Sequence, residues 1–289
     1  SFQCAWLAHY YQIEWMAAFL GKEVEKKDED KYEAITKVKA AGIAIKKPCV
    51  NTSNVYWEIS DDGKSLIQPL TSIKGLGEKA ANEIIENRPF NTIEDILFNE
   101  NISYRALNKR CLDVLCRSGA AEELCDERFS GNKHFWSSVA VDRPKTPKKL
   151  AANIDLYEAE GSFIKNEQIE NIYSLLGTFP IELVMSDKIR SSIIRYGVSC
   201  IGKYDTEKVE EVVWFIPTEV KKRRTSNGRP YIIVNTIDSS FRACKIKCWG
   251  YSSEAKDFSV NGIYIGKVKY DPKWGFSMAD SKKNLKRIG

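Results

Sequence analysis

Residues 70–85 read Leu70-Thr-Ser-Ile73-Lys74-Gly75-Leu76-Gly77-Glu78-Lys79-Ala80-Ala81-Asn82-Glu83-Ile84-Ile85, and the fold of the first half of the chain depends on them. Apolar residues recur at helical spacing on both sides of Gly75-Leu76-Gly77, which predicts two short helices joined by a tight turn. Glycine adopts backbone angles that a side chain forbids, so this turn can lie flat against a ligand. The helix after Gly77 begins with unpaired N–H groups, for which a backbone phosphate is a natural ligand.

This stretch resembles the helix-hairpin-helix motif, which binds nucleic-acid phosphates without reading bases. The resemblance rests on an apolar residue before the turn, on Gly-apolar-Gly, and on small and then apolar residues after it. It implies a duplex-phosphate site formed by Ile73, Lys74, Gly75, Leu76, Gly77 and Lys79. The alternative is a plain helical hairpin with a glycine turn, which the flanking pattern disfavours.

Charge is unevenly distributed along the 289 residues, whose formal net charge is +5. Lys and Arg outnumber Asp and Glu from Tyr196 to the C-terminus, whereas acidic residues are in slight excess before it. This segregation favours the C-terminal third as the surface for a polyanion.

The eight cysteines contain no Cys-x-x-Cys pair, and only His9 and His134 are available beside them. We therefore predict buried free thiols, no metal site and a reducing compartment. No secretory signal and no membrane-spanning apolar run is visible, so we expect a cytoplasmic protein of a bacterium or a phage-infected cell.

Several further elements follow from the residue pattern. We expect two buried helices at residues 5–11 and 15–20, an amphipathic helix at 31–42 and a small hairpin over 55–67. A capping box around Asn91 predicts a helix near Thr92, and a further helix is predicted over residues 107–116.

A series of short motifs appears in a fixed order along this part of the chain. It comprises Ala40-Gly42-Ile43, Pro48, Asn51-x-Ser53, the hairpin, Asn87-Arg88-Pro89-Phe90, Leu107-Asn108-Lys109-Arg110 and Ser118-Gly119-Ala120. The series is similar to the segment that joins the fingers domain to the helix-hairpin-helix domain in the alpha subunit of bacterial replicative DNA polymerase III. The resemblance covers most of residues 1–125 and resumes near residue 168.

This resemblance implies four regions. Residues 1–50 would be the end of a fingers-like helical domain, 51–125 a helix-hairpin-helix domain that binds duplex DNA or a clamp, 126–195 a linker with connecting helices, and 196–289 an OB domain. The fold class is then multidomain α+β: an all-α N-terminal region with tandem helix-hairpin-helix, a linker, and a C-terminal five-stranded OB-fold β-barrel.

Residues 126–167 begin polar and contain Arg143-Pro-Lys-Thr-Pro147-Lys-Lys149, a linker composition. Family members carry a clamp-binding peptide, Gln-x-(Asp or Ser)-Leu-Phe, in a similar place. The run here, Asn153-Ile-Asp155-Leu156-Tyr157, departs from it at both ends. The resemblance implies a sliding clamp as partner, bound by Asn153, Asp155, Leu156 and Tyr157. The alternative is an ordinary linker anchor.

From Val198 the apolar period changes to two. Five strands are expected, with a helix at residues 252–258 between the third and the fourth, which is the OB-fold order. Asn227-Gly228 is typical of the turn in the first hairpin. Since adjacent strand residues point to opposite faces, we expect at least one of Trp214 and Phe215 in the core.

Single-strand binders of this architecture combine cations along the backbone with aromatic residues on which bases stack. The expected single-strand site comprises Lys221, Lys222, Arg223, Arg224, Arg229, Tyr231, Lys245, Lys247 and Trp249. The alternative is that the basic run is a solvated hairpin tip.

A polymerase needs clustered carboxylates that hold two metal ions, and no such cluster is evident here. The resemblance implies that the palm domain, its Mg²⁺ ions and the nucleotidyltransferase chemistry lie upstream. We expect this chain to need no cofactor, to be inactive alone, and to bind duplex and single-stranded DNA beside an upstream palm and fingers part.

One alternative is a free-standing replication or repair accessory protein that binds DNA. A second alternative is a base-excision enzyme, for which Asp95 is the nearest carboxylate. A helix-capping role explains Asp95 more simply.

Overall fold

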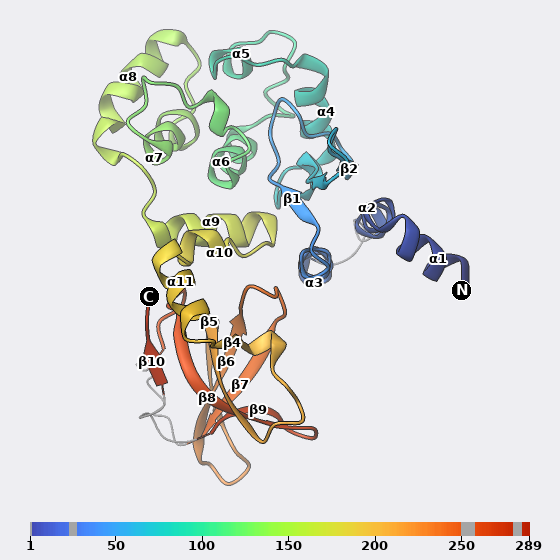
Figure 1. Cartoon of the computed structure of the whole chain (residues 1–289). Coiled ribbons are helices and arrows are strands. Elements are labelled where there is room, and N and C mark those ends of the chain that lie inside the picture. Colours follow the sequence, from blue (N-terminus) through green and yellow to red (C-terminus); the bar gives the residue numbers. More distant parts are fainter. Residues whose placement is uncertain (1, 23–27, 250–257, 280–284) are drawn as a thin grey trace. The chain divides into compact units, whose positions relative to one another are not determined.

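The computed structural model describes residues 2–22, 28–249, 258–279 and 285–289. The chain divides between Phe179 and Pro180 into two compact units (Figure 1). The first unit is mainly helical with one small sheet, and the second consists mainly of strands. The expected α+β class is therefore confirmed.

The first unit begins with three helices and a small sheet. In chain order its elements are α1 (Phe2–Tyr10), α2 (Gln12–Lys22), α3 (Asp28–Ala40), β1 (Ala44–Lys46), β2 (Glu58–Ile59), β3 (Ser65–Ile67), η2 (Leu70–Ser72), α4 (Glu78–Asn87), α5 (Glu94–Leu97), α6 (Lys109–Ser118), η3 (Glu122–Leu124), α7 (Asn132–Trp136), the π-helical turn η4 (Ser137–Val141), α8 (Pro147–Tyr157), η5 (Glu158–Glu160) and α9 (Lys165–Leu176). Strand β3 pairs parallel with β1 and antiparallel with β2. The first helix of the predicted hairpin is only the single 3₁₀ turn η2.

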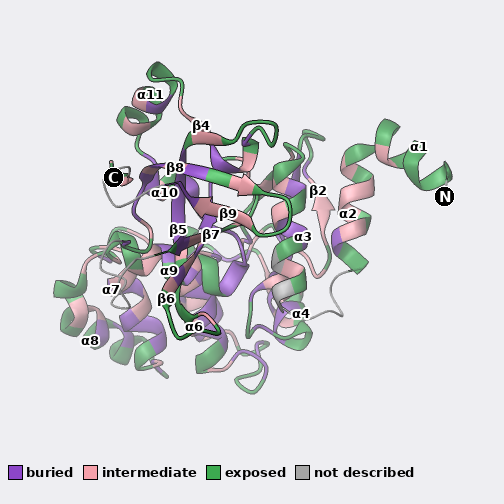
Figure 2. Cartoon of the chain, turned by 90° about the horizontal axis from the view of Figure 1, so that it is seen from below, coloured by how far each residue is buried: buried purple, intermediate pink, exposed green. Residues whose placement is uncertain are grey.

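Helix α6 occupies the main core of the first unit. The Asn108 side chain accepts hydrogen bonds from two amides at its start, and Gly119 ends it in the left-handed conformation. Its buried residues pack with those of α4 and of later helices. By contrast, α1 has no buried residue and is drawn mostly as exposed in Figure 2. The expected burial of α1 is wrong, since apolar composition does not by itself provide a partner surface.

Residues 126–164 are folded into the first unit, although their composition favours a linker. They form α7, η4, α8 and η5. The core that contains α4 and α6 also contains Phe129, Phe135, Val139 and Leu150. These apolar residues are spread over short helices between lysines and prolines. No single long periodic stretch therefore predicts that this segment is part of the core.

The second unit is built around one long, curved sheet. Its elements are α10 (Ile181–Val184), α11 (Asp187–Arg195), β4 (Ser199–Cys200), η6 (Ile201–Lys203), β5 (Glu210–Arg224), β6 (Pro230–Ile237), β7 (Cys244–Trp249), β8 (Tyr264–Asp271), β9 (Gly275–Met278) and β10 (Leu285–Arg287). Strand β5 pairs with β6 and with β8, so the pairings run β5–β6–β7–β9–β8 and return to β5. The expected helix at 252–258 falls almost entirely on residues outside the described ranges.

Alternation along β5 separates two apolar environments. Phe215 is completely buried in the core of the sheet, together with Ile232, Val234 and Ile246. Trp214 is 4% exposed and lines a pocket of about 660 Å³ with Ile181, Met185 and Ile193, which belong to α10, α11 and the segment between them. Both residues are therefore buried, which agrees with the expectation for Trp214 and Phe215.

Candidate nucleic-acid interface

The glycine turn between η2 and α4 has an anchored side and an open side. Ile73 and Leu76 are buried, whereas Lys74, Gly75, Gly77 and Lys79 are exposed. Gly75 has a φ of +96°, a conformation that glycine adopts without strain. The Lys74 N–H donates to the Leu175 carbonyl at 2.9 Å, which ties the turn to α9. The six predicted residues thus comprise two anchors and four solvent-facing positions.

Gly77 begins α4 in an extended conformation and provides no side-chain cap. The first amides of a helix have no partner within the helix. Because Gly77, Glu78 and Lys79 are all exposed, this end of α4 is open to an external acceptor.

Arg110 of α6 lies over the glycine turn, a position that sequence reasoning missed. A Cβ built on Gly75 would lie 3.6 Å from Arg110 Nε and 3.4 Å from Val114 Cγ1. Arg110 is exposed, and its guanidinium forms no ion pair with any residue in the described ranges. The Asn108-Lys109-Arg110 run was recognisable as a motif, but nothing in its spacing places it beside Gly75.

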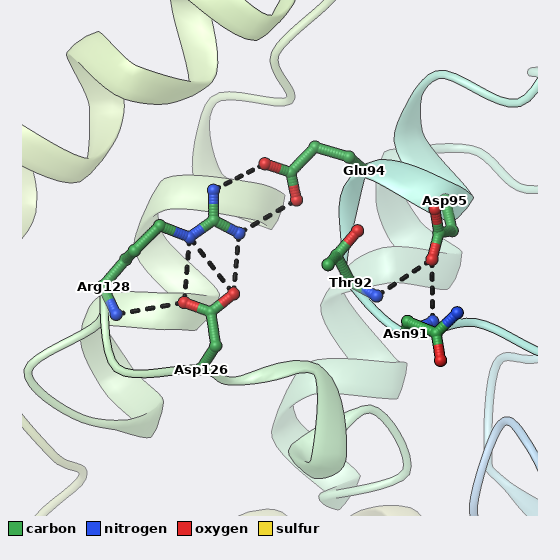
Figure 3. A network of polar contacts seen from close by, with 6 residues as sticks. All are labelled: Asn91, Thr92, Glu94, Asp95, Asp126 and Arg128. Carbon is green, nitrogen blue, oxygen red and sulfur yellow. Dashed lines mark hydrogen bonds and ion pairs between the residues drawn. The ribbon is translucent and has the colours of Figure 1, made fainter.

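A charged network joins α5 to the segment after η3 (Figure 3). The Arg128 guanidinium donates to both carboxylate oxygens of Glu94, at 2.6 and 3.0 Å, and to those of Asp126. These hydrogen bonds hold the pKa of Glu94 and of Asp126 below their usual ranges. Residues 126–128 are therefore fixed to the helix-hairpin-helix region.

Asp95 lies beside this network and caps the turn before α5 (Figure 3). Its Oδ2 accepts the backbone N–H groups of Asn91 at 2.7 Å and Thr92 at 2.9 Å. These two bonds lower the pKa of the Asp95 carboxyl. The geometry is that of a structural cap, which agrees with the capping role expected for Asp95.

Arg128→Ala is expected to lower the unfolding free energy of the first unit by about 1–2 kcal/mol at neutral pH, since a bidentate network is removed from a partly exposed site. The folded-state pKa values of Glu94 and Asp126 are depressed. Their contribution is therefore complete above the unfolded pKa values and disappears as the pH falls through the folded ones. Denaturant titrations at neutral pH and at about pH 3 should show the deficit shrinking in acid.

The control is Lys37→Ala, which removes an exposed ion pair with Glu33 at 2.8 Å. Exposed ion pairs contribute little to stability, so this variant should have the same free energy of unfolding as the parent at both pH values. An Arg128→Ala deficit that stays constant into acid would show that the network is not its source.

The predicted clamp-binding residues do not form one open surface. They lie in the last two turns of α8, where Asn153 is completely buried. Its Nδ2 donates to the carbonyls of Ser138 and Asp142, at 2.9 and 2.7 Å. Asp155 and Leu156 are exposed, and Tyr157 is half-buried. An extended peptide that offers Asn153 to a partner would require α8 to unwind.

The strand register arranges most of the predicted single-strand residues in three rows across β5, β6 and β7. The rows are Arg223–Tyr231–Trp249, Lys221–Ile233–Lys247 and Glu219–Asn235–Lys245. Side chains directly opposite each other on neighbouring strands share a face. One outer face therefore carries Lys221, Arg223, Tyr231, Lys245, Lys247 and Trp249.

The remaining predicted cations lie elsewhere. Successive strand residues point to opposite faces, so Lys222 and Arg224 fall on the other side of β5. Arg229 lies in the turn before β6, where Gly228 has a φ of +75° and Arg224 donates to its carbonyl at 3.2 Å. The structure thus divides the nine predicted residues into six on one face and three outside it.

A stacked aromatic pair, half-buried Tyr231 and exposed Trp249, lies at the end of this face nearest the turn between β5 and β6. The rings of Tyr231 and Trp249 stack with centroids 4.6 Å apart and an interplanar angle of 29°. Trp249 is 51% exposed. Lys221 is paired with Glu219 at 2.8 Å, whereas Arg223 is exposed beside Tyr231. Flat aromatic surface and positive charge therefore lie in adjacent rows.

Other candidate chemistry is sparse. Within the residues that the structure describes, no three His, Cys, Asp or Glu side chains are grouped as metal ligands. All eight cysteines are free thiols. Burial raises the pKa of the Cys244 thiol to about 11. No helix in the described ranges combines the length and apolar character needed to cross a bilayer.

Comparison with known proteins bears on the first unit most directly. Residues 42–130 match a family model described as a helix-hairpin-helix motif. DNA polymerase III subunit alpha of Pseudomonas fluorescens is 34% identical over 144 residues, which cover 50% of this chain and 12% of that protein. The same subunit of Deinococcus radiodurans is 31% identical over 202 residues, covering 68% and 13%.

DNA polymerase III subunit alpha of Thermus aquaticus is 34% identical over 131 residues, 44% of this chain and 10% of that protein. The chain thus spans between 10% and 13% of these three relatives. The family resemblance drawn from the motif series is confirmed. Residues 42–130 carry a helix-hairpin-helix motif, and over about half of its length this chain is similar to part of the alpha subunit of DNA polymerase III.

Proposed function

We propose that this chain is a DNA-binding part of a replicative polymerase, with a duplex site in the first unit and a single-strand site in the second. The duplex site is the exposed turn at Gly75 and Gly77. It is supported by the helix-hairpin-helix match and by the uncapped start of α4. Backbone amides and the exposed Lys79 would contact phosphates of the duplex without reading its sequence.

The single-strand site is the outer face of β5, β6 and β7. The circular order of strand pairings, with β7 and β9 parallel, supports an OB-type barrel. The observation that carries this site is the register that sets Arg223, Tyr231 and Trp249 side by side. Bases would stack on the exposed aromatic surface, while the lysine rows neutralise the backbone.

The polymerase context comes from the relatives, which are named as alpha subunits of DNA polymerase III. The chain covers a small part of their length, so nucleotide transfer, its Mg²⁺ ions and the palm that holds them would belong to the remaining part. We assign no chemical step to the residues of this chain. Because Asn153 is buried in α8, we do not extend the proposal to clamp docking.

Two charge-matched variants test the single-strand site. Lys221→Ala/Arg223→Ala removes two cations from the proposed face, and Lys222→Ala/Arg224→Ala removes two from the opposite face of the same strand. Fluorescence anisotropy of labelled dT12 across a salt series should show about tenfold weaker binding for the first variant. Its slope of log K against log salt should fall by roughly 1.4, for two lost phosphate contacts.

The second variant should lose less than about threefold in dT12 affinity and keep its salt slope nearly unchanged. Lys222 and Arg224 do not lie along the path proposed for the DNA. Equal losses in both variants would mean that the hairpin attracts DNA only through its total charge. No measurable dT12 binding by the parent chain would refute the single-strand site altogether.

A further inference from the structure

We propose that the single-strand face has a second stacking platform, Trp274, and that it therefore binds strands long enough to reach both platforms. The inference rests on the proposed single-strand function. Trp274 lies in the turn between β8 and β9 and is 62% exposed. Tryptophan is enriched at interfaces, because its large aromatic surface and its N–H group both serve in binding.

Trp274 is connected to the face by a lysine of the middle row. Lys247 Nζ donates to the Trp274 carbonyl at 2.9 Å and lies 5.3 Å from the centre of the indole ring. Lys273 Nζ also lies 5.3 Å from that ring. The indole therefore has two ammonium groups beside it, and single-strand sites combine positive charge with aromatic surface in this way.

The turn that carries Trp274 is preorganised by its backbone. Asp271 Oδ1 accepts the N–H groups of Lys273 and Trp274, both at 2.8 Å. Gly275 follows with a φ of +73°. None of these bonds uses the indole, whose neighbours are the two lysine ammonium groups, so the backbone alone holds the turn in position.

The register of β7 against β9 fixes the separation of the platforms. These strands pair parallel, with Ile246 opposite Phe276 and Lys247 opposite Ser277. Extended by two residues into the turn, this pairing places Trp274 level with residue 244, five residues from Trp249 along β7, or roughly 16 Å at the usual rise. With an axial rise of about 3.4 Å per nucleotide in a stacked strand, about five nucleotides span that distance.

The loss of affinity caused by Trp274→Ala should accordingly depend on the length of the oligonucleotide. For dT12, which can occupy both platforms, loss of one stacked base should weaken binding about tenfold. For dT3, which can occupy only one platform at a time, the loss should stay within about twofold. Trp274→Phe keeps a stacking ring and should recover most of the dT12 affinity.

Tyr196→Ala is the matched control, since Tyr196 is 75% exposed in the same unit but lies at the end of α11, outside the three strands. It should bind both oligonucleotides like the parent. Equal effects of Trp274→Ala on dT3 and dT12, or no effect on either, would overturn the second platform. If Trp249→Ala weakens dT12 binding in that case, the single-strand site itself survives; if the parent does not bind dT12, the proposed function fails first.

Discussion

Gly75→Ala is expected to weaken binding of a 20-base-pair duplex at least tenfold while the first unit stays folded. Gly75 has a φ of +96°, where a side chain costs roughly 1–2 kcal/mol. The new Cβ would also lie 3.4 Å from Val114 Cγ1 and 3.6 Å from Arg110 Nε. These are ordinary van der Waals contacts, so the strain comes from the positive φ, and its relief would shift the turn that would meet the phosphates. Fluorescence anisotropy of the labelled duplex measures the loss.

Gly63→Ala separates backbone strain from the geometry of the site. Gly63 lies in the turn between β2 and β3, has a φ of +66°, and a Cβ there would meet nothing within 4 Å. It should show a similar loss of stability and unchanged duplex affinity. Binding of dT12 should be unaffected in both variants, since the proposed single-strand site lies in the other unit. Equal duplex affinity in the two glycine variants would remove the hairpin from the duplex site.

Much of the first unit could be predicted because its signals are local. The glycine turn and the end of α6 near Gly119 each depend on a few neighbouring residues. Motif pieces that lie far apart also meet: the Asn51 side chain exchanges two hydrogen bonds of 2.8 Å with the Phe90 backbone. Their fixed order was visible in the sequence, whereas the contact between them was not.

Which residues meet at each candidate site is harder to predict from the sequence than which region of the chain contains the site. Arg110 reaches Gly75 only because α6 packs beside the turn, a contact across 35 positions that no local pattern encodes. Charge and proximity in sequence place the nine predicted single-strand residues in one group. Strand alternation alone already separates Lys221 and Arg223 from Lys222 and Arg224. Trp274 lies beside Lys247 because β7 pairs with β9, a pairing that is set by the tertiary fold.

His134→Ala is expected to lower the unfolding free energy of the first unit by about 3–4 kcal/mol, through a cavity and two lost hydrogen bonds. His134 is completely buried. Its Nδ1 accepts the Ser130 N–H at 2.9 Å, and its Nε2 donates to the Ile154 carbonyl at 2.8 Å. The imidazole thus joins the start of α7 to α8, so its loss leaves polar backbone groups on both sides without partners.

Hydrogen exchange of residues 129–160, read beside a denaturant titration, locates the loss in this segment. Leu156→Ala is the control on α8, because Leu156 is 67% exposed and should change stability by less than about 0.5 kcal/mol. If His134→Ala lowers the unfolding free energy by as little as Leu156→Ala does, residues 126–164 behave as the linker that their lysines and prolines suggest. A large, localised loss instead means that buried contacts at Phe129, His134 and Leu150 outweigh the composition, and that the helix-hairpin-helix region folds together with this segment.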